Sequence, residues 1–206
     1  MHDKLPIMKK EIPYFTIENS FGGDQRWFRN PLMRIGGCAA ATACDSLILL
    51  SLPPGRSIST KKDYRRFASR MRPYLYPRKT GVNTLKLFMD GFNEYLDDIG
   101  CHGLHMKGFS GEEPVTDAKK AIIRQIDDGL PIPYLLLKHK NPDFKNLTWH
   151  WFILLGYEET PEDFTVTAAT YGTSHTLNLS DLWDTGYKEK GGMILYRLDE
   201  PSSVIE

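Results

Sequence analysis

Cys38 and His150 are the two residues of this chain whose types and surroundings could support nucleophilic chemistry. Cys38 follows Gly36 and Gly37 and opens a run rich in alanine, the residue with the highest helix propensity. A thiol in the first turn of a buried helix lies at the positive end of the helix dipole, which favours the thiolate, the nucleophilic form of cysteine. A small buried cysteine without a chemical role is the commoner explanation of such a residue. The thiol therefore needs a partner elsewhere in the chain before it indicates catalysis.

His150 lies near the start of an apolar segment, residues 148–157, which predicts a strand inside a sheet. Because side chains alternate along a strand, His150 should share a face with Phe152 and Leu154, and we expect that face to pack on the helix that Cys38 opens. An imidazole at a strand end can accept the thiol proton and later protonate a leaving group. A buried histidine held by structural hydrogen bonds is the alternative.

The elements that must position this pair are helices in the first part of the chain and strands in the second. Helical spacing of apolar residues predicts helices over residues 38–50, 61–75, 84–99 and 118–128. Apolar or alternating segments predict strands over residues 12–17, 104–109, 133–138, 148–157, 164–170, 175–179 and 193–198. Because no repeat or low-complexity linker interrupts this order, we expect one α+β domain over residues 1–206, with residues 1–20 as a lead-in segment.

Composition and charge give no indication of a nucleic-acid or membrane partner. The chain has 26 Lys and Arg and 26 Asp and Glu, so its formal net charge is zero. No apolar run approaches the roughly 18 residues that a membrane span needs, and the N-terminal segment has no apolar core of signal-peptide length. Three cysteines are too few, and an odd number, for a disulfide framework. We therefore expect a cytoplasmic protein.

Two further clusters are of ligand-binding residue types, but each has a simpler explanation. Residues 61–72 carry six cations, and such a run is usually a solvated helix face, with an anion or RNA contact as the alternative. Cys101, His102 and His105 lack a second ligand pair at zinc-site spacing, and the segment that follows alternates like a strand. No phosphate-loop or dinucleotide motif is present. The sequence thus predicts neither a metal nor a cofactor.

The chain resembles the papain-like cysteine peptidases, and among them the branch that processes bacteriocins. The resemblance covers about residues 20–198. It depends on Gln25, on Gly37-Cys38-Ala39-Ala40 opening an apolar helix, on Gly129-Leu130-Pro131 before a strand, and on His150-Trp151-Phe152-Ile153 followed by Gly156-Tyr157. It implies a papain-like fold, in which N-terminal helices, with a central buried helix, pack on a mostly antiparallel C-terminal sheet.

The resemblance implies Cys38 as nucleophile and His150 as general base of a cysteine peptidase that acts on a peptide or small amide through an acyl-enzyme. It also implies that the side-chain amide of Gln25 and the backbone N–H of Cys38 form an oxyanion hole. Gln25 lies thirteen residues before Cys38, more than is usual in the family. We expect residues 29–36 to be an insertion that absorbs the difference.

The residue that orients the histidine in this family is missing. The family places an Asp or Asn near the end of the strand after the histidine strand, and here residues 164–170 contain neither. The Thr170 hydroxyl or a backbone carbonyl is the expected replacement, with Asn178 and Asp181 as more remote ones. Because a thiol depends less on its base than a serine hydroxyl does, activity does not strictly require the missing group.

Two other functions fit the same residues. The missing orienting residue suggests a non-catalytic binding protein that keeps the fold. A Cys–His pair also serves acyl transfer of the transglutaminase-like or arylamine acetyltransferase-like kind, which differs from hydrolysis only in the acceptor that reaches the acyl-enzyme. Trp27, Trp149 and Trp151 suggest an aromatic-walled groove, with core packing as the alternative. The sequence leaves the substrate and the oligomeric state open.

Overall fold

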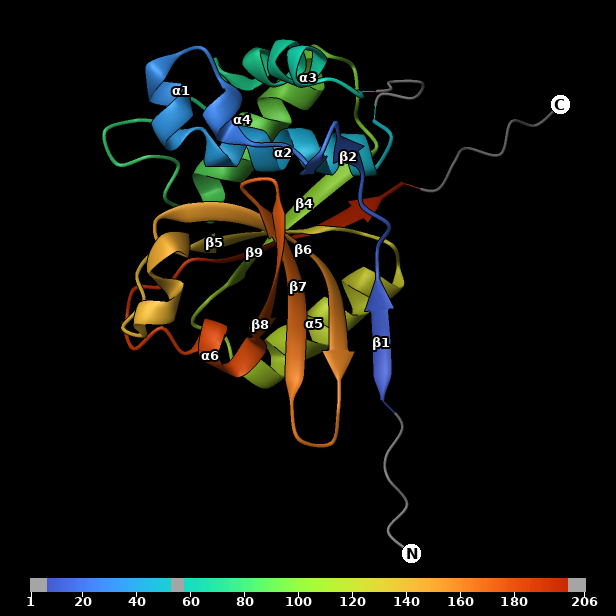
Figure 1. The fold of residues 1–206 in the computed structure, drawn as a ribbon, viewed down its shortest axis with the longest axis vertical. Helices are drawn as coiled ribbons and strands as arrows, with labels where there is room; N and C mark the ends of the chain where they lie inside the picture. Colours follow the sequence, from blue (N-terminus) through green and yellow to red (C-terminus); the bar gives the residue numbers. More distant parts are fainter. Residues whose placement is uncertain (1–6, 53–57, 200–206) are drawn as a thin grey trace, which may run out of the picture.

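The computed structural model describes residues 7–52 and 58–199, which form a sheet between two groups of helices (Figure 1). Residues 1–6 of the predicted lead-in lie outside the described part of the chain. The helices are α1 (Pro31–Gly36), α2 (Cys38–Leu49), α3 (Lys61–Ala68), α4 (Leu85–Asp98), α5 (Val115–Asp127) and α6 (Leu179–Trp183), with 3₁₀ turns η1 (Gln25–Trp27), η2 (Ser69–Met71) and η3 (Pro142–Leu147). The strands are β1 (Met8–Glu11), β2 (Thr16–Ile17), β3 (Ser20–Phe21), β4 (Leu104–Ser110), β5 (Ile132–Leu136), β6 (His150–Glu159), β7 (Phe164–Thr170), β8 (Thr173–Asn178) and β9 (Gly192–Leu198).

The main sheet has the strand order β4-β9-β5-β6-β7-β8. β5 pairs with the first half of β6 and β1 with the second half, so these two strands share one side of β6. Every pairing of this sheet in the described residues is antiparallel. The predicted α+β class with a mostly antiparallel sheet is therefore confirmed, but β1 precedes the first helices, and α5 and α6 lie between strands along the chain.

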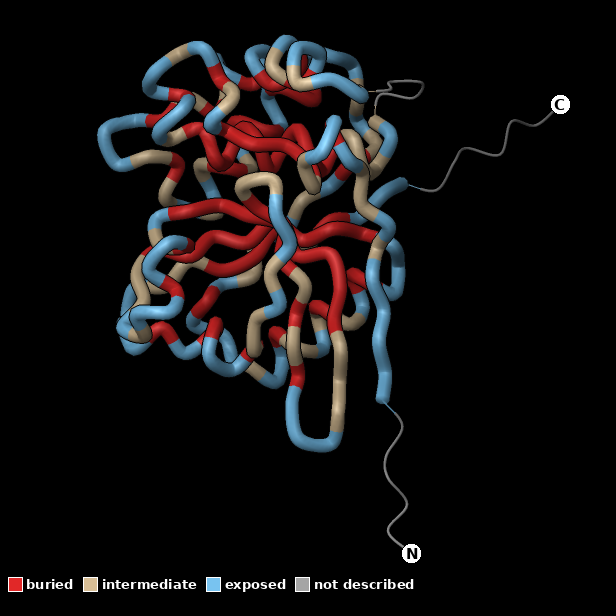
Figure 2. Tube along the Cα trace, viewed as in Figure 1, coloured by how far each residue is buried: buried red, intermediate tan, exposed pale blue. Residues whose placement is uncertain are grey.

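The two faces of the sheet carry separate cores, and buried residues concentrate between the layers (Figure 2). Leu135 and Trp151 belong to the core that includes α2, α3 and α4. Tyr134, Phe152 and Leu154 belong to the core that includes α5 and α6. The expectation that Phe152 and Leu154 pack on the Cys38 helix is thus wrong. That face is covered by α5, because in this part of β6 it is Trp151 that belongs to the core of α2.

Helix α2 is the central buried helix that the sequence predicts, since ten of its twelve residues are buried. Its small side chains allow the helix to lie close to β6. Gly37 is at once the C-cap of α1 and the N-cap of α2, and a Cβ at this position would lie 2.3 Å from the Met33 carbonyl oxygen. Glycine is therefore required for the two helices to follow each other so closely.

The elements that differ most from expectation are the N-terminal strand and the end of α3. Instead of a strand over residues 12–17, the chain forms β1, whose four residues are all exposed, and the two-residue β2. Because β1 is polar and pairs only through its backbone, its sequence has no alternation of apolar residues from which a strand could be predicted. Helix α3 gives way to η2 after Ala68, well before residue 75, and Pro73 lies just beyond that turn.

The cysteines are three free thiols, Cys38, Cys44 and Cys101, as the absence of a disulfide pattern in the sequence predicts. Within residues 7–52 and 58–199, none of the helices combines the length and the hydropathy needed to cross a membrane.

Candidate active site

The four residues selected from the sequence, Gln25, Cys38, His150 and Thr170, line one small cavity of about 20 Å³. The first turn of α2 places Cys38 there, the start of β6 places His150, the end of β7 places Thr170, and η1 places Gln25. The structure therefore brings together side chains that lie far apart in the sequence, since Thr170 follows Gln25 by 145 residues. Cys38 and His150 are 8% and 4% exposed, so the cavity is nearly closed to solvent.

Thr170 is a hydrogen-bond partner of the His150 imidazole. Its hydroxyl oxygen lies 2.6 Å from Nε2 of His150, and both side chains are buried. In the tautomer that carries its proton on Nε2, the imidazole donates to Thr170 and leaves Nδ1 able to accept a proton. This is the protonation state that a general base needs.

Cys38 lies against Trp151, the second residue of β6. The backbone N–H of Trp151 is directed at its sulfur, as are backbone N–H groups of the first turn of α2. The thiol also lies close enough to Tyr171 to raise the pKa of that phenol, after the larger effect of burial. The sulfur is thus next to Trp151, which follows His150 in the chain, and to Tyr171, which contacts the His150 ring.

Tyr171 covers the imidazole and was not foreseen from the sequence. Its ring stacks on that of His150 with centroids 4.4 Å apart and planes 8° from parallel, and its hydroxyl lies 3.3 Å from Nδ1. Tyr171 has φ 52° and Gly172 has φ 73°, as a two-residue type I′ hairpin turn requires. Arg26 braces this turn: Nη2 donates to the Tyr171 carbonyl at 2.8 Å, and the guanidinium lies 5.3 Å from the ring centroid.

Asp24 supplies negative charge beside the imidazole. Its carboxylate is 4% exposed and accepts hydrogen bonds from the backbone N–H and the guanidinium of Arg26. This charge raises the pKa of His150, although burial has the larger and opposite effect. The imidazole thus has a hydrogen-bond partner in Thr170 and a neighbouring negative charge in Asp24. The feature of the sequence that could have identified Asp24 as a site residue is its position directly before Gln25.

Burial sets the protonation of the pair. It raises the pKa of the Cys38 thiol, and the backbone N–H groups directed at the sulfur offset this only in part. It also lowers the pKa of His150 to about 4. The N–H groups of the helix N-terminus favour the thiolate, as expected, but desolvation has the larger and opposite effect. At neutral pH the pair is a thiol and a neutral imidazole.

Gln25 lies beside Cys38, but its amide hydrogens point elsewhere. Nε2 donates to the carbonyls of Arg34 at 3.2 Å and Ile35 at 2.8 Å, while Oε1 is buried without a hydrogen-bond partner. The expected insertion, residues 29–36, forms the N-cap and body of α1, and Gln25 caps the end of that helix. Its amide must rotate away from α1 before it can donate to an oxyanion.

Asp45 is a buried carboxylate that lines the same cavity, two turns along α2 from Cys38. It accepts hydrogen bonds from the hydroxyls of Tyr14 at 2.6 Å and Tyr64 at 2.8 Å and from the backbone of Gly23 at 3.1 Å. Burial nevertheless raises its pKa to about 6. Asp45 is the one acidic residue of a largely apolar helix, and this feature of the sequence could have identified it as a candidate site residue.

The buried His150 and Asp45 should act on stability in opposite directions below pH 6.5. His150 titrates near 6.5 when unfolded and about 4 when folded, so its contribution is complete above pH 6.5 and is lost as the pH falls through 4. Asp45 titrates at 3.8 when unfolded and about 6 when folded, so its contribution is complete below pH 3.8 and is lost as the pH rises through 6. The two effects nearly cancel in the native protein.

We expect Asp45→Asn to reveal the pH dependence of stability that His150 causes, because the opposing contribution of Asp45 is removed. The free energy of unfolding of this variant should fall by about 2 kcal/mol more than that of the native protein between pH 7 and pH 4. His150→Gln should show the opposite change over the same range. Urea denaturation at both pH values measures this difference, and groups common to all variants cancel. Equal pH dependence in the native protein and Asp45→Asn would mean that Asp45 is not the compensating group.

The remaining sequence candidates lie outside this site. Asn178 caps α6 by accepting from the backbone N–H of Asp181, so both belong to a helix end. The predicted aromatic groove is not formed by Trp151, which is buried and stacks on Phe88. Over the described ranges, no group of three His, Cys, Asp or Glu side chains is arranged to hold a metal ion.

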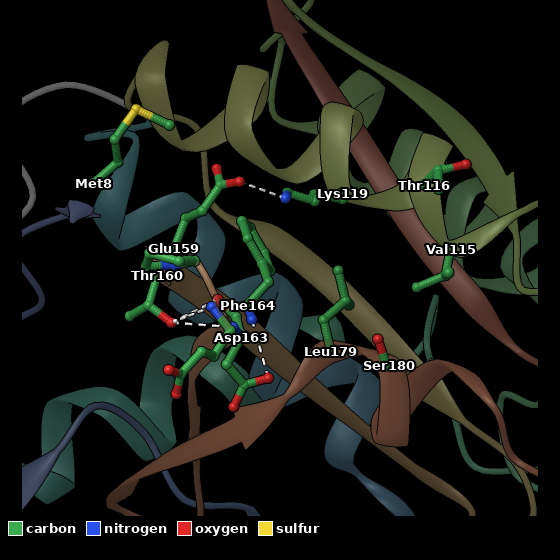
Figure 3. A pocket seen from close by; sticks show the side chains of 12 residues that line it. Met8, Val115, Thr116, Lys119, Glu159, Thr160, Asp163, Phe164, Leu179 and Ser180 are labelled. Atoms are coloured by element: carbon green, nitrogen blue, oxygen red, sulfur yellow. Dashed lines mark hydrogen bonds and ion pairs between the residues drawn. The ribbon is translucent and has the colours of Figure 1, made fainter. Parts of the chain in front are cut away.

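A roomier hollow, about 550 Å³, lies between α5, the turn from β6 to β7 and the start of α6 (Figure 3). There Lys119 pairs with Glu159 and lies over the ring of Phe164. Glu159 follows His150 by nine residues along β6, which at roughly 3.3 Å per residue separates them by about 30 Å. This hollow therefore takes no part in the Cys38 site.

No family model matches this chain, and comparisons with curated proteins and with solved structures find no significant match either.

Proposed function

We propose that this chain is a papain-like thiol hydrolase that cleaves a peptide or small amide through an acyl-enzyme on Cys38. The observation that supports it most is the convergence of the thiol with an imidazole whose far nitrogen is held by Thr170 at 2.6 Å. A nucleophile beside a base that is itself oriented by a third group is the arrangement that covalent acyl chemistry uses.

The chemistry begins with transfer of the Cys38 proton to Nδ1 of His150. The thiolate attacks the substrate carbonyl, and the oxyanion that forms is stabilised by the backbone N–H of Cys38. The imidazolium then protonates the leaving amine, which departs and leaves a thioester on Cys38. Water, deprotonated by His150, hydrolyses the thioester and regenerates the thiol. The carboxylate of Asp24 favours the imidazolium that this sequence requires.

Substrate entry must precede these steps, because Tyr171 occupies Nδ1 and covers the ring. We interpret the closed cavity as a resting state, in which the neutral pair is protected until the Tyr171 turn moves. A reducing compartment, which we propose to be the cytoplasm, keeps Cys38 in the free thiol form.

The second candidate function is a binding protein without catalysis. It is favoured by the cavity of only about 20 Å³ and by the raised pKa of the Cys38 thiol. Acyl transfer uses the same thiol and imidazole, so the acceptor alone separates it from hydrolysis.

Incubation with p-nitrophenyl acetate, followed by intact mass measurement and peptide mapping, tests the proposal. We expect one acetyl group on Cys38, which is lost again on standing, and none in Cys38→Ala. Cys101→Ala is the matched control and should be acetylated like the native protein, because Cys101 lines no part of the site. If Cys38 is not acetylated faster than Cys101, the binding protein is the better interpretation. If added glycinamide captures the acetyl group faster than water does, the protein is an acyltransferase.

A further inference from the structure

A second hollow, of about 360 Å³, is lined by Arg29, Lys62, Arg65, Arg66 and Ser69. We call it the basic hollow. It contains four cationic side chains and no carboxylate, although the whole chain has zero formal net charge. Such a concentration of one charge in a concave site is the electrostatic arrangement that attracts an anion.

The arrangement of these residues follows from the helical period. Lys62, Arg65, Arg66 and Ser69 are spaced i, i+3, i+4 and i+7 along α3 and η2, so they form one stripe along the helix. The buried residues of α3 lie on its other side, in the core with α2. Arg29 reaches the same hollow from the loop between η1 and α1, more than thirty residues earlier.

The cations of the basic hollow are not neutralised by the protein. Within residues 7–52 and 58–199, none of the four side chains has an ion pair or a side-chain hydrogen bond, whereas the neighbouring Lys61 is paired with Glu18. Like charges at i, i+3 and i, i+4 repel each other on a helix surface. An anion bound in the hollow would remove this repulsion, while a purely solvated face gives no reason for Arg29 to join the stripe.

We propose that the basic hollow binds a compact phosphorylated small molecule. A phosphoryl group carries close to two negative charges at neutral pH and accepts paired hydrogen bonds from a guanidinium, so one or two such groups match the four cations. The volume is at the lower end of the roughly 300–1,000 Å³ of small-molecule sites. No aromatic side chain lines the hollow, so a single-stranded nucleic acid would find no stacking surface. None of its residues lines the Cys38 cavity, and the proposal is therefore independent of the hydrolase.

Isothermal titration calorimetry with pyrophosphate at low salt tests this site. We expect the native protein to bind one pyrophosphate, and Arg29→Gln/Arg65→Gln to bind it at least about a hundredfold more weakly, roughly tenfold for each lost guanidinium. Arg78→Gln/Lys79→Gln removes two exposed cations that do not line the hollow and should bind like the native protein. Far-UV circular dichroism checks folding, and the exposed pair Lys62→Gln/Arg66→Gln replaces the first variant if Arg65 proves necessary for the fold.

Four results would overturn the proposal. Absence of pyrophosphate binding, or equal weakening in both double variants, would show that the cations form an ordinary solvated surface. Citrate binding as tightly as pyrophosphate would show that the hollow does not select phosphoryl groups. A single-stranded RNA oligonucleotide that binds more tightly than pyrophosphate, through the same two arginines, would reassign the surface to nucleic acid.

Discussion

Replacement of His150 with alanine is expected to slow the acetylation of Cys38 by on the order of 10²- to 10⁴-fold, the contribution typical of a general base. The reason is that the proposed mechanism transfers the thiol proton to Nδ1. Because burial has raised the pKa of this thiol, the thiolate is scarcely populated at neutral pH without the histidine. Stopped-flow measurement of p-nitrophenolate release at pH 7 gives this rate directly. In the variant, the rate should rise continuously with pH as the thiol ionises by itself.

Thr170→Val is the matched control for this prediction. It keeps the shape of the buried side chain and removes only the hydroxyl that holds Nε2. Loss of this hydrogen-bond partner should lower the acetylation rate about tenfold, because the imidazole can still accept the proton but is no longer held in one orientation. An undiminished rate in His150→Ala would show that the histidine has only a structural role, and the hydrolase proposal would then be abandoned.

The parts of the fold that the sequence predicted best are those in which a long apolar pattern has one period. Helix α2 and strand β6 appear within a few residues of their expected bounds, because burial along most of their length makes their patterns unambiguous. Strand β1 could not be predicted in this way. It is exposed throughout and is held by backbone pairing to β6, so nothing in its side chains marks it as a strand.

The site was predictable to the extent that single residues carry a chemical signal. Cys38, His150 and Thr170 were chosen for type and position, and they share a cavity. Tyr171 and Asp24 were missed, because the sequence gives no measure of which loop crosses which strand end. The protonation states were also out of reach. A helix N-terminus is visible in a sequence, whereas the burial that outweighs it depends on the surrounding layers.

The closed cavity links these missed residues to the proposed function. Burial lowers the pKa of His150 to about 4, and Tyr171 is the side chain that lies flat on that ring. Arg26 fixes the Tyr171 turn and at the same time pairs with Asp24, the one charge that favours the imidazolium. Movement of this turn would therefore admit solvent, raise the basicity of His150 and expose Cys38 in a single step.

Removal of the Tyr171 ring is accordingly expected to activate the thiol. Tyr171→Gly keeps the hairpin turn, because glycine adopts a φ of 52° without strain. Each unit by which the pKa of His150 recovers from about 4 toward 6.5 makes the thiolate–imidazolium pair about ten times more populated. A recovery of one to two units should raise the rate of Cys38 alkylation by a limiting dose of iodoacetamide roughly 10- to 100-fold. Peptide mapping measures this rate, with Cys101 in the same sample as the internal reference.

The pH profile and one further variant separate this effect from simple loosening of the fold. In Tyr171→Gly, the alkylation rate should show an inflection at the higher pKa of His150, and that inflection should be absent from Tyr171→Gly/His150→Ala. Tyr171→Phe retains the stacked ring and loses only the hydroxyl near Nδ1, so its rate should stay close to that of the native protein. If Cys38 and Cys101 are accelerated equally in Tyr171→Gly, the ring does not gate the thiol. The resting-state interpretation of the closed cavity would then fail, because the ring would have been shown to fill space and nothing more.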